Sequence, residues 1–254
     1  MLKSFLTVAL SVACVSPAFA GWQANQYHDN KFTLPYQLYS PSQSGRLPLI
    51  IHLHGTGEAG TDNQAQMYKN TGWGPQYFAS KTNQSIQAAY VLAPQTPGPM
   101  RWASTTLAAY NFKQTPSTPS MTALLHLIDN LIKTNSHIDR NRIYITGLSR
   151  GGQGVWNAMM QRPKLFAAAV PIAGSADPKQ ASTINHIPTW VFHGSADEVT
   201  SVDYSRQMVD AIIRSGGSTS TIRYTEIEGG DHASSWKAAY SNDGVYRWLM
   251  KHHK

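Results

Sequence analysis

A Gly-x-Ser-x-Gly pentapeptide at residues 147–151 constrains the fold of this chain more than any other feature. The β-branched and aromatic run 143–146 before it predicts a strand, and the segment 152–161 after it predicts a helix. A serine on a sharp turn between strand and helix projects its hydroxyl away from the sheet. Such a strained turn needs neighbours without side chains. The pentapeptide therefore predicts a nucleophilic serine at Ser149.

Strand and helix patterns alternate along the rest of the chain. Apolar or alternating runs predict a hairpin over 27–39 and strands at 47–55, 89–93, 167–172, 189–193 and 221–227. Helical spacing predicts helices at 121–132, 202–213 and 236–250, the last possibly broken at Gly244, and residues 56–80 and 95–119 read mainly as loops. This alternation is typical of an α/β fold with a mostly parallel central sheet flanked by helices. We expect a single α/β-hydrolase-like domain over residues 21–254.

The first twenty residues predict a secretory signal peptide. Lys3 precedes the largely apolar run 5–15, and Ala18-Phe19-Ala20 is a small-x-small cleavage site. Cys14 is the only cysteine in the chain, so residues 21–254 contain none and cannot form a disulfide. No later run is apolar for long enough to span a membrane. We therefore expect a secreted or periplasmic protein.

The formal net charge of +7 favours anionic surroundings in general. Lys and Arg do not form blocks and do not alternate with aromatic residues, so nucleic acid is not an expected partner. His52 and His54 share one face of a predicted strand, but no third ligand follows at a useful spacing. We expect no metal and no cofactor, and the sequence leaves the oligomeric state open.

A serine nucleophile needs a histidine base, and the base needs an acid that holds its tautomer. In this strand-turn-helix setting the residues follow in the order Ser, acid, His. His232 follows the last predicted strand and fits the base. Gly-Ser-Ala-Asp occurs twice after a strand, so Asp197 and Asp177 are both candidate acids. We prefer Asp197, because the strand nearer the histidine usually carries the acid.

The attack of a serine on a carbonyl also needs donors to the oxyanion that forms. The backbone N–H of Arg150, directly after the serine, is one candidate. The second is expected from the loop after the 47–55 strand, and Thr56 is the best placed residue there.

Four motifs together resemble a known family. They are His-Gly-Thr-Gly-Glu at 54–58 with Asp-Asn at 62–63, Gly-Leu-Ser-Arg-Gly at 147–151, His-Gly-Ser-Ala-Asp at 193–197, and His232 followed by Trp236. Over about residues 25 to 250 the chain resembles α/β-hydrolase serine esterases of the secreted polyhydroxybutyrate-depolymerase, feruloyl-esterase and predicted-peptidase group. The resemblance implies Ser149 as nucleophile, Asp197 as acid, His232 as base, and Thr56 and Arg150 as oxyanion donors. Many depolymerases have Cys where Thr56 stands and use disulfides, and this chain has neither.

We therefore expect a serine hydrolase that cleaves carboxylic esters through an acyl-enzyme, with a small-molecule or polymer-linked ester as substrate. Trp73, Trp102 and Trp236 are candidate walls of the substrate pocket. A serine peptidase of the prolyl-oligopeptidase type is the alternative within enzymes. A non-catalytic binding protein on the same fold is the alternative outside them.

Overall fold

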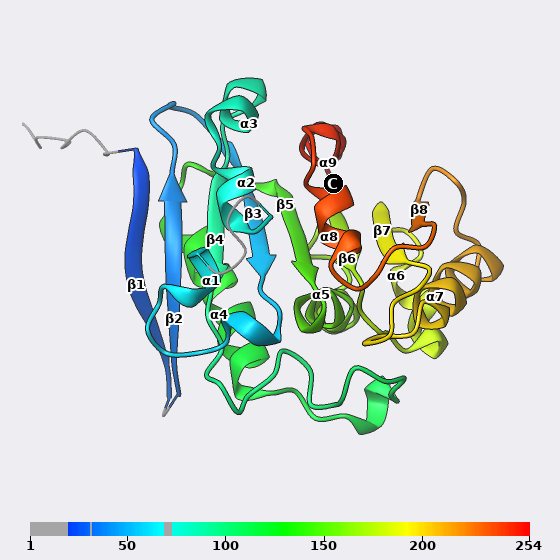
Figure 1. The fold of residues 1–254 in the computed structure, drawn as a ribbon. Coiled ribbons are helices and arrows are strands. Elements are labelled where there is room, and N and C mark those ends of the chain that lie inside the picture. The colour runs from blue at the N-terminus through cyan, green and yellow to red at the C-terminus, as the bar shows by residue number, and fades with distance from the viewer. Residues whose placement is uncertain (1–19, 31, 69–72) are drawn as a thin grey trace, which may run out of the picture.

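Eight strands form one sheet in the order β1-β2-β4-β3-β5-β6-β7-β8 (Figure 1). β1 (Gly21–Asp29) and β2 (Phe32–Ser40) make the expected hairpin, and β2 is antiparallel to β4 (Tyr90–Pro94). The other strands, all in parallel pairs, are β3 (Leu47–Leu53), β5 (Ile138–Leu148), β6 (Ala168–Ile172), β7 (Thr189–Gly194) and β8 (Ile222–Ile227). The predicted mostly parallel α/β sheet is confirmed.

This computed structural model describes residues 20–30, 32–68 and 73–254. The predicted signal peptide lies, except for Ala20, outside the described residues. None of the helices within the described part has the length and apolar character needed to cross a membrane. In the same part of the chain, no cluster of three His, Cys, Asp or Glu side chains is arranged to hold a metal ion.

The helices and short 3-10 turns lie between the strands in sequence, except α8 and α9, which follow β8. In chain order they are η1 (Thr56–Glu58), α1 (Ala65–Tyr68), α2 (Pro75–Phe78), α3 (Lys81–Ile86), η2 (Phe112–Gln114), α4 (Pro119–Thr134), α5 (Arg150–Gln161), η3 (Pro178–Gln180), α6 (Ala181–Ile184), α7 (Asp203–Arg214), α8 (Ser234–Ala239) and α9 (Gly244–Leu249). The closing segment forms two helices, α8 and α9, because the chain turns at Asn242, whose side-chain oxygen accepts the Gly244 N–H at 2.8 Å.

Helices cover both faces of the sheet and bury two separate apolar clusters. On one face α4, α5, α6 and α7 pack against the strands, with Leu124, Trp156 and Met208 among the buried side chains. On the other face α2, α8 and α9 contribute Phe78, Tyr240 and other rings. Burial on both faces explains why the central strands are almost continuously apolar.

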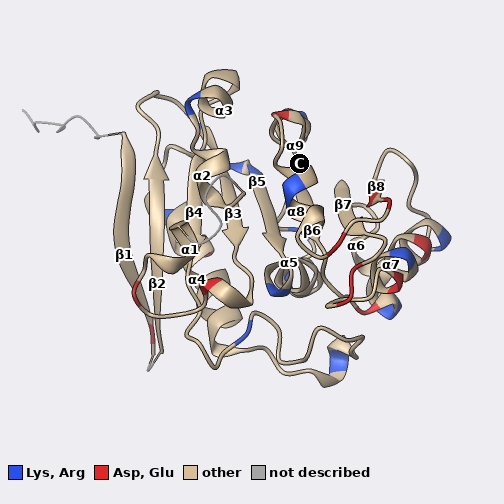
Figure 2. Cartoon of the chain, viewed as in Figure 1, with Lys and Arg blue, Asp and Glu red and all other residues tan. Residues whose placement is uncertain are grey.

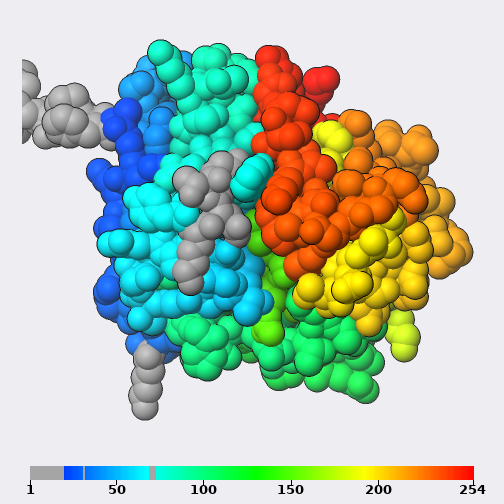
Figure 3. Space-filling model, viewed as in Figure 1, coloured from blue at the N-terminus to red at the C-terminus, as the bar shows by residue number. Residues whose placement is uncertain are grey.

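The C-terminal helices pack against the segment that contains α2 and α3, although the two are far apart in sequence. The Tyr77 hydroxyl donates to the Asn242 carbonyl at 2.7 Å, and Tyr246 donates to the Gln87 carbonyl. In the space-filling view these red and orange helices lie between the α2–α3 segment and the yellow region that follows β7 (Figure 3). These contacts attach α9 and the turn before it to the α2–α3 segment.

Charges of both signs are distributed over several elements (Figure 2). On α7, for example, Arg206 forms ion pairs with Asp203 and with Glu226 of β8. These are exposed pairs, which contribute little to stability.

Candidate active site

Ser149 occupies a sharp turn between β5 and α5. Its backbone has φ 56° and ψ −118°, a conformation that side chains rarely adopt, and its N–H donates to the Ile172 carbonyl at 2.8 Å. A Cβ at Gly151 would lie 2.0 Å from the Leu53 carbonyl oxygen, and one at Gly147 would lie 2.7 Å from the backbone of Gly151. The two glycines therefore allow α5 to start directly against the strands, as the turn requires.

The sheet register brings loops from four strands to the same end. Leu53 of β3 pairs with Gly147 of β5, and Gly194 of β7 pairs with Ile227 of β8. The carboxyl ends of parallel strands meet at one edge of a sheet, where open α/β sheets usually carry their sites. The loops that hold Thr56, Asp197 and His232 leave from this edge.

A chain of two hydrogen bonds joins the three predicted side chains. Nε2 of His232 lies 2.9 Å from Oγ of Ser149, and Nδ1 lies 2.6 Å from Oδ2 of Asp197. When Nδ1 donates its proton to Asp197, Nε2 keeps a lone pair that can accept the Ser149 proton. The structure thus brings Ser149, His232 and Asp197 together in the order that proton transfer needs.

The Asp197 carboxylate is fully buried and accepts several hydrogen bonds. Oδ1 accepts the backbone N–H groups of Val199 and Thr200 at 2.8 and 2.9 Å, and Oδ2 faces Nε2 of His193 at 3.2 Å as well as His232. Burial by itself would raise the pKa of Asp197. The donors from His193, His232 and Thr200 outweigh it and hold this pKa well below the usual range of a carboxyl. The group is therefore an anion at neutral pH.

Asp177, the alternative acid, has different partners. Its Oδ1 accepts the Lys179 N–H at 3.0 Å as a cap of η3, and its Oδ2 accepts the Phe112 N–H at 2.9 Å. These contacts attach the long loop 95–118 to the turn after β6. The structure places Asp197, and not Asp177, at His232.

Each of the two predicted oxyanion donors stands at the N-terminus of a helical segment. Thr56 is the first residue of η1 and Arg150 is the first residue of α5. The N–H of a first helical residue has no acceptor within its helix, so both amides can donate to a ligand. Thr56 lines the hollow that also contains Ser149, and Arg150 directly follows Ser149 in the chain, so both residues lie beside the nucleophile.

A hollow of about 310 Å³ exposes the site, and Ser149, His232 and Trp236 line it with Leu107 and Val199. The Trp236 ring meets the His232 ring edge to face, with centroids 5.1 Å apart. One predicted pocket wall, Trp236, therefore lies directly on the catalytic histidine candidate.

The other two tryptophans are placed differently. Trp102 is 1% exposed, and its indole N–H donates to the His54 carbonyl at 3.1 Å, while its ring lines the second cavity described below. Trp73 is 36% exposed and lies under the ammonium group of Lys237 at 5.6 Å, outside the residues that line the hollow.

His193 belongs to the His-Gly-Ser-Ala-Asp motif, but the sequence assigned it no role in the site. His193 is fully buried, and its Nδ1 shares a hydrogen bond of 2.7 Å with Ser205 Oγ. Its Nε2 faces both the Thr200 carbonyl and the Asp197 carboxylate. Its position at the end of β7, four residues before Asp197, is the sequence signal that could have indicated it.

Residues 39–239 match the family model of the phospholipase/carboxylesterase group, and the chain belongs to that family. Poly(3-hydroxyalkanoate) depolymerase C of Paucimonas lemoignei is 27% identical over 179 residues, which is 68% of this chain and 39% of the depolymerase. The crystal structure of a thermostable esterase superposes with a TM-score of 0.84 at 36% identity. The match covers 92% of this chain and 63% of the esterase chain. A ferulic acid esterase shares the fold alone, with a TM-score of 0.66 at 14% identity over 91% of this chain and 99% of the esterase.

The chain therefore spans about two fifths of the depolymerase and less than two thirds of the thermostable esterase. The expected α/β-hydrolase esterase group is confirmed as the family of this chain.

Proposed function

We propose that this protein is a serine hydrolase that cleaves carboxylic esters through an acyl-enzyme on Ser149. The single observation that carries the proposal is the hydrogen-bonded chain Ser149–His232–Asp197, with distances of 2.9 and 2.6 Å. The names of the family and of the similar esterase support ester bonds as the target.

In the first step the Ser149 hydroxyl attacks the ester carbonyl while Nε2 of His232 takes its proton. The imidazolium that forms is stabilised by the Asp197 anion, which stays deprotonated. His232 then returns the proton to the leaving alcohol, and the C–O bond breaks to leave the acyl group on Ser149. A water molecule, deprotonated by the same histidine, hydrolyses this intermediate.

The tetrahedral intermediate carries its charge on the former carbonyl oxygen. The backbone N–H groups of Thr56 and Arg150 donate to this oxygen, and the N-terminus of α5 adds its positive partial charge. One such donor is worth about 3 kcal/mol of barrier, roughly a hundredfold in rate. Because both donors belong to the backbone, replacing the side chains of Thr56 or Arg150 leaves the amides in place.

The test compares kcat/KM on 4-nitrophenyl butyrate for the wild type, Ser149→Ala and Ser182→Ala. Ser182 is an exposed serine on α6, so its variant is the matched control. We expect Ser149→Ala to lose at least about 10³-fold and the control to retain the wild-type rate. Equal rates in all three proteins would exclude Ser149 as the nucleophile.

A peptide bond is the alternative target, since acylaminoacyl peptidase of Pyrococcus horikoshii shares the fold at a TM-score of 0.67 and 16% identity. Turnover rates of short chromogenic peptides, measured beside those of esters of increasing acyl chain length, distinguish a peptidase from an esterase. Turnover of the esters alone supports the proposal, turnover of the peptides alone supports a peptidase, and turnover of neither supports a binding protein.

We also propose that the protein is exported, because the pattern in residues 1–20 is typical of a signal peptide. Expression of the full chain in a secreting host, followed by N-terminal sequencing, tests this. A mature N-terminus at Gly21 in the exported fraction is expected. A product that keeps residues 1–20 and stays inside the cell would contradict export.

A further inference from the structure

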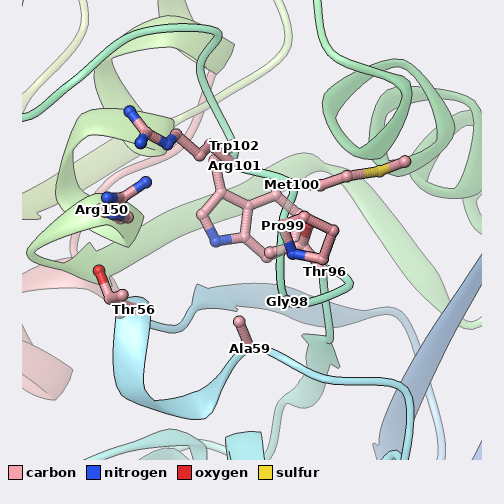
Figure 4. A pocket seen from close by; sticks show the side chains of 10 residues that line it. Thr56, Ala59, Thr96, Gly98, Pro99, Met100, Arg101, Trp102 and Arg150 are labelled. Carbon is pink, nitrogen blue, oxygen red and sulfur yellow. The ribbon is translucent and has the colours of Figure 1, made fainter.

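A second cavity, of about 190 Å³, lies beside the oxyanion donors (Figure 4). Its walls include Thr56, Ala59, Pro99, Trp102 and two arginines, Arg101 and Arg150. Figure 4 shows the two guanidinium groups next to each other on one side of the cavity. Gly55 and Thr56 line both this cavity and the hollow above Ser149, so a bound molecule can extend from one into the other.

In the described part of the chain, several arginines are neutralised by an acidic partner, whereas Arg101 and Arg150 are not. Arg162, Arg206 and Arg247 each form an ion pair with Asp or Glu. Among the described residues, no ion pair includes Arg101 or Arg150.

The guanidinium group of Arg101 is held by a hydrogen bond, and that of Arg150 is partly buried. Nη1 of Arg101 donates to the Thr105 carbonyl at 2.6 Å, which fixes this group at the cavity. Nε of Arg150 is buried and has no hydrogen-bond partner among the described residues. A buried donor without an acceptor is costly, so an acceptor from a bound ligand would stabilise this group.

The two positive charges also oppose each other. Burial and then the charge of Arg101 lower the pKa of Arg150. Arginine does not release its proton in proteins, so the repulsion cannot be relieved by deprotonation. An anion between the two groups removes this repulsion and supplies the missing acceptor. A carboxylate fits best, because guanidinium groups bind it through paired hydrogen bonds.

The position of the cavity indicates which part of the substrate carries the anion. His232 must protonate the leaving alcohol, so the alcohol lies on the side of His232 and Trp236, in the hollow above Ser149. The arginine cavity contains the oxyanion residues but neither His232 nor Trp236. It therefore lies toward the acid portion of the ester.

We propose that Arg101 and Arg150 form a subsite for a carboxylate on the acid portion of the substrate, so that the preferred substrates are monoesters of dicarboxylic acids. This inference rests on the proposed ester hydrolysis at Ser149. The subsite selects among esters, while the hydrogen-bonded chain of Ser149, His232 and Asp197 performs the cleavage.

Two nitrophenyl esters of the same acid test the subsite. Mono-4-nitrophenyl adipate carries a free carboxylate, and methyl 4-nitrophenyl adipate carries a neutral methyl ester at the same position. Both release nitrophenolate, so the ratio of their kcat/KM values isolates the charge. A longer pair, made from suberic acid, covers the case in which adipate is too short to reach the arginines. A blank without enzyme corrects for spontaneous hydrolysis.

In the wild type, we expect kcat/KM for the charged ester to exceed that for the neutral ester about tenfold or more, in whichever of the adipate and suberate pairs gives the larger ratio. In Arg101→Gln this ratio should fall by about the same factor, and Arg101→Lys should recover part of it. Arg214→Gln is the control for net charge, because Arg214 is exposed on α7, and it should keep the wild-type ratio.

The outcomes separate the two proposals. A wild-type ratio near one for both pairs, or a ratio that Arg101→Gln leaves unchanged, overturns the subsite, while turnover of the neutral ester by Ser149 keeps the proposed function. If neither ester is cleaved in a manner that depends on Ser149, both proposals are wrong. Turnover of the neutral ester by Arg101→Gln also shows that this variant is folded.

Discussion

Nε2 of His193 lies 3.2 Å from Oδ2 of Asp197, the same carboxylate oxygen that accepts a hydrogen bond from His232. His193 is itself held by Ser205 Oγ and by the Thr200 carbonyl, and none of its surface is exposed. We infer that His193 is a positioning residue, which fixes the carboxylate that in turn orients His232.

We predict that His193→Ala lowers kcat by about 10-fold to 100-fold with little change in KM, because a misplaced acid impairs proton transfer more than binding. His193→Gln should recover part of kcat, since its amide can donate to the carboxylate. Steady-state kinetics on a neutral nitrophenyl ester measure both constants. A loss confined to KM, or no recovery in the glutamine variant of a folded protein, would argue against a positioning role.

The partners of the two candidate acids give the second prediction. Asp197→Asn should lower kcat by about 10³- to 10⁴-fold, because an amide cannot stabilise the imidazolium and favours the wrong tautomer of His232. Asp177→Asn should keep most of its kcat and lose only about 1 kcal/mol of stability, since it weakens a cap and a loop contact. Turnover and urea unfolding of both variants provide the comparison. The assignment fails if Asp177→Asn, and not Asp197→Asn, abolishes turnover.

The placement of the tryptophans predicts unequal effects on substrate binding. Trp236→Ala removes a wall of the hollow above Ser149 on the side of the leaving alcohol, so it should raise KM for nitrophenyl esters by about 10-fold. Trp73→Ala, outside that hollow, should change KM much less. KM values for a series of nitrophenyl esters in both variants decide the matter. Equal effects would mean that the substrate also covers the exposed Trp73.

Two buried histidines on β3 and directly after it make stability depend on pH. Burial lowers the pKa of His52 to about 3 and that of His54 to about 4, from an ordinary value of 6.5. Below pH 6.5 the unfolded chain therefore takes up protons that the folded chain refuses. The stability that these groups contribute above pH 6.5 is lost progressively as the pH falls toward the folded values.

His52 offers a test, since it packs between the rings of Phe78 and Tyr240 and neither ring nitrogen has a hydrogen-bond partner among the described residues. Between about pH 6 and 4.5 the unfolding free energy of the wild type falls as the pH is lowered. We predict that this fall is less steep in His52→Phe, and that the two slopes differ by about 1.4 kcal/mol per pH unit. Urea unfolding at several pH values measures both slopes. Parallel curves for variant and wild type would contradict the account.

The elements with strong local patterns could be predicted from the sequence. The turn at Ser149 was predictable because a strained strand-to-helix connection demands glycine on both sides. The alternation of apolar strands and amphipathic helices predicted the parallel sheet, and the chain order Ser, acid, His predicted which loops would meet. Choosing between Asp197 and Asp177 needed the structure, because the same three residues, Gly-Ser-Ala, precede both.

Elements without an apolar pattern were missed. α3 has a single large apolar residue, Ile86, and depends on a cap in which Ser80 accepts the Asn83 N–H, so no periodicity reveals it. β5 starts at Ile138, five residues before the predicted strand, because the polar residues 139–142 hide its first part.

Contacts between distant loops were also hidden. Arg101 and Arg150 come close through the long loop 95–118, which Asp177 helps to hold in place through Phe112. A pair separated by 49 positions leaves no local signal in a single sequence.

A fluorophosphonate probe tests the central claim most directly, since it forms a covalent bond only with a serine made nucleophilic by its neighbours. The labelled protein is digested and the modified peptide is identified by mass spectrometry. We predict one label on Ser149, strongly reduced in His232→Ala and absent in Ser149→Ala. A folded wild-type protein that takes up no label, or that is labelled on a different serine, would contradict the account.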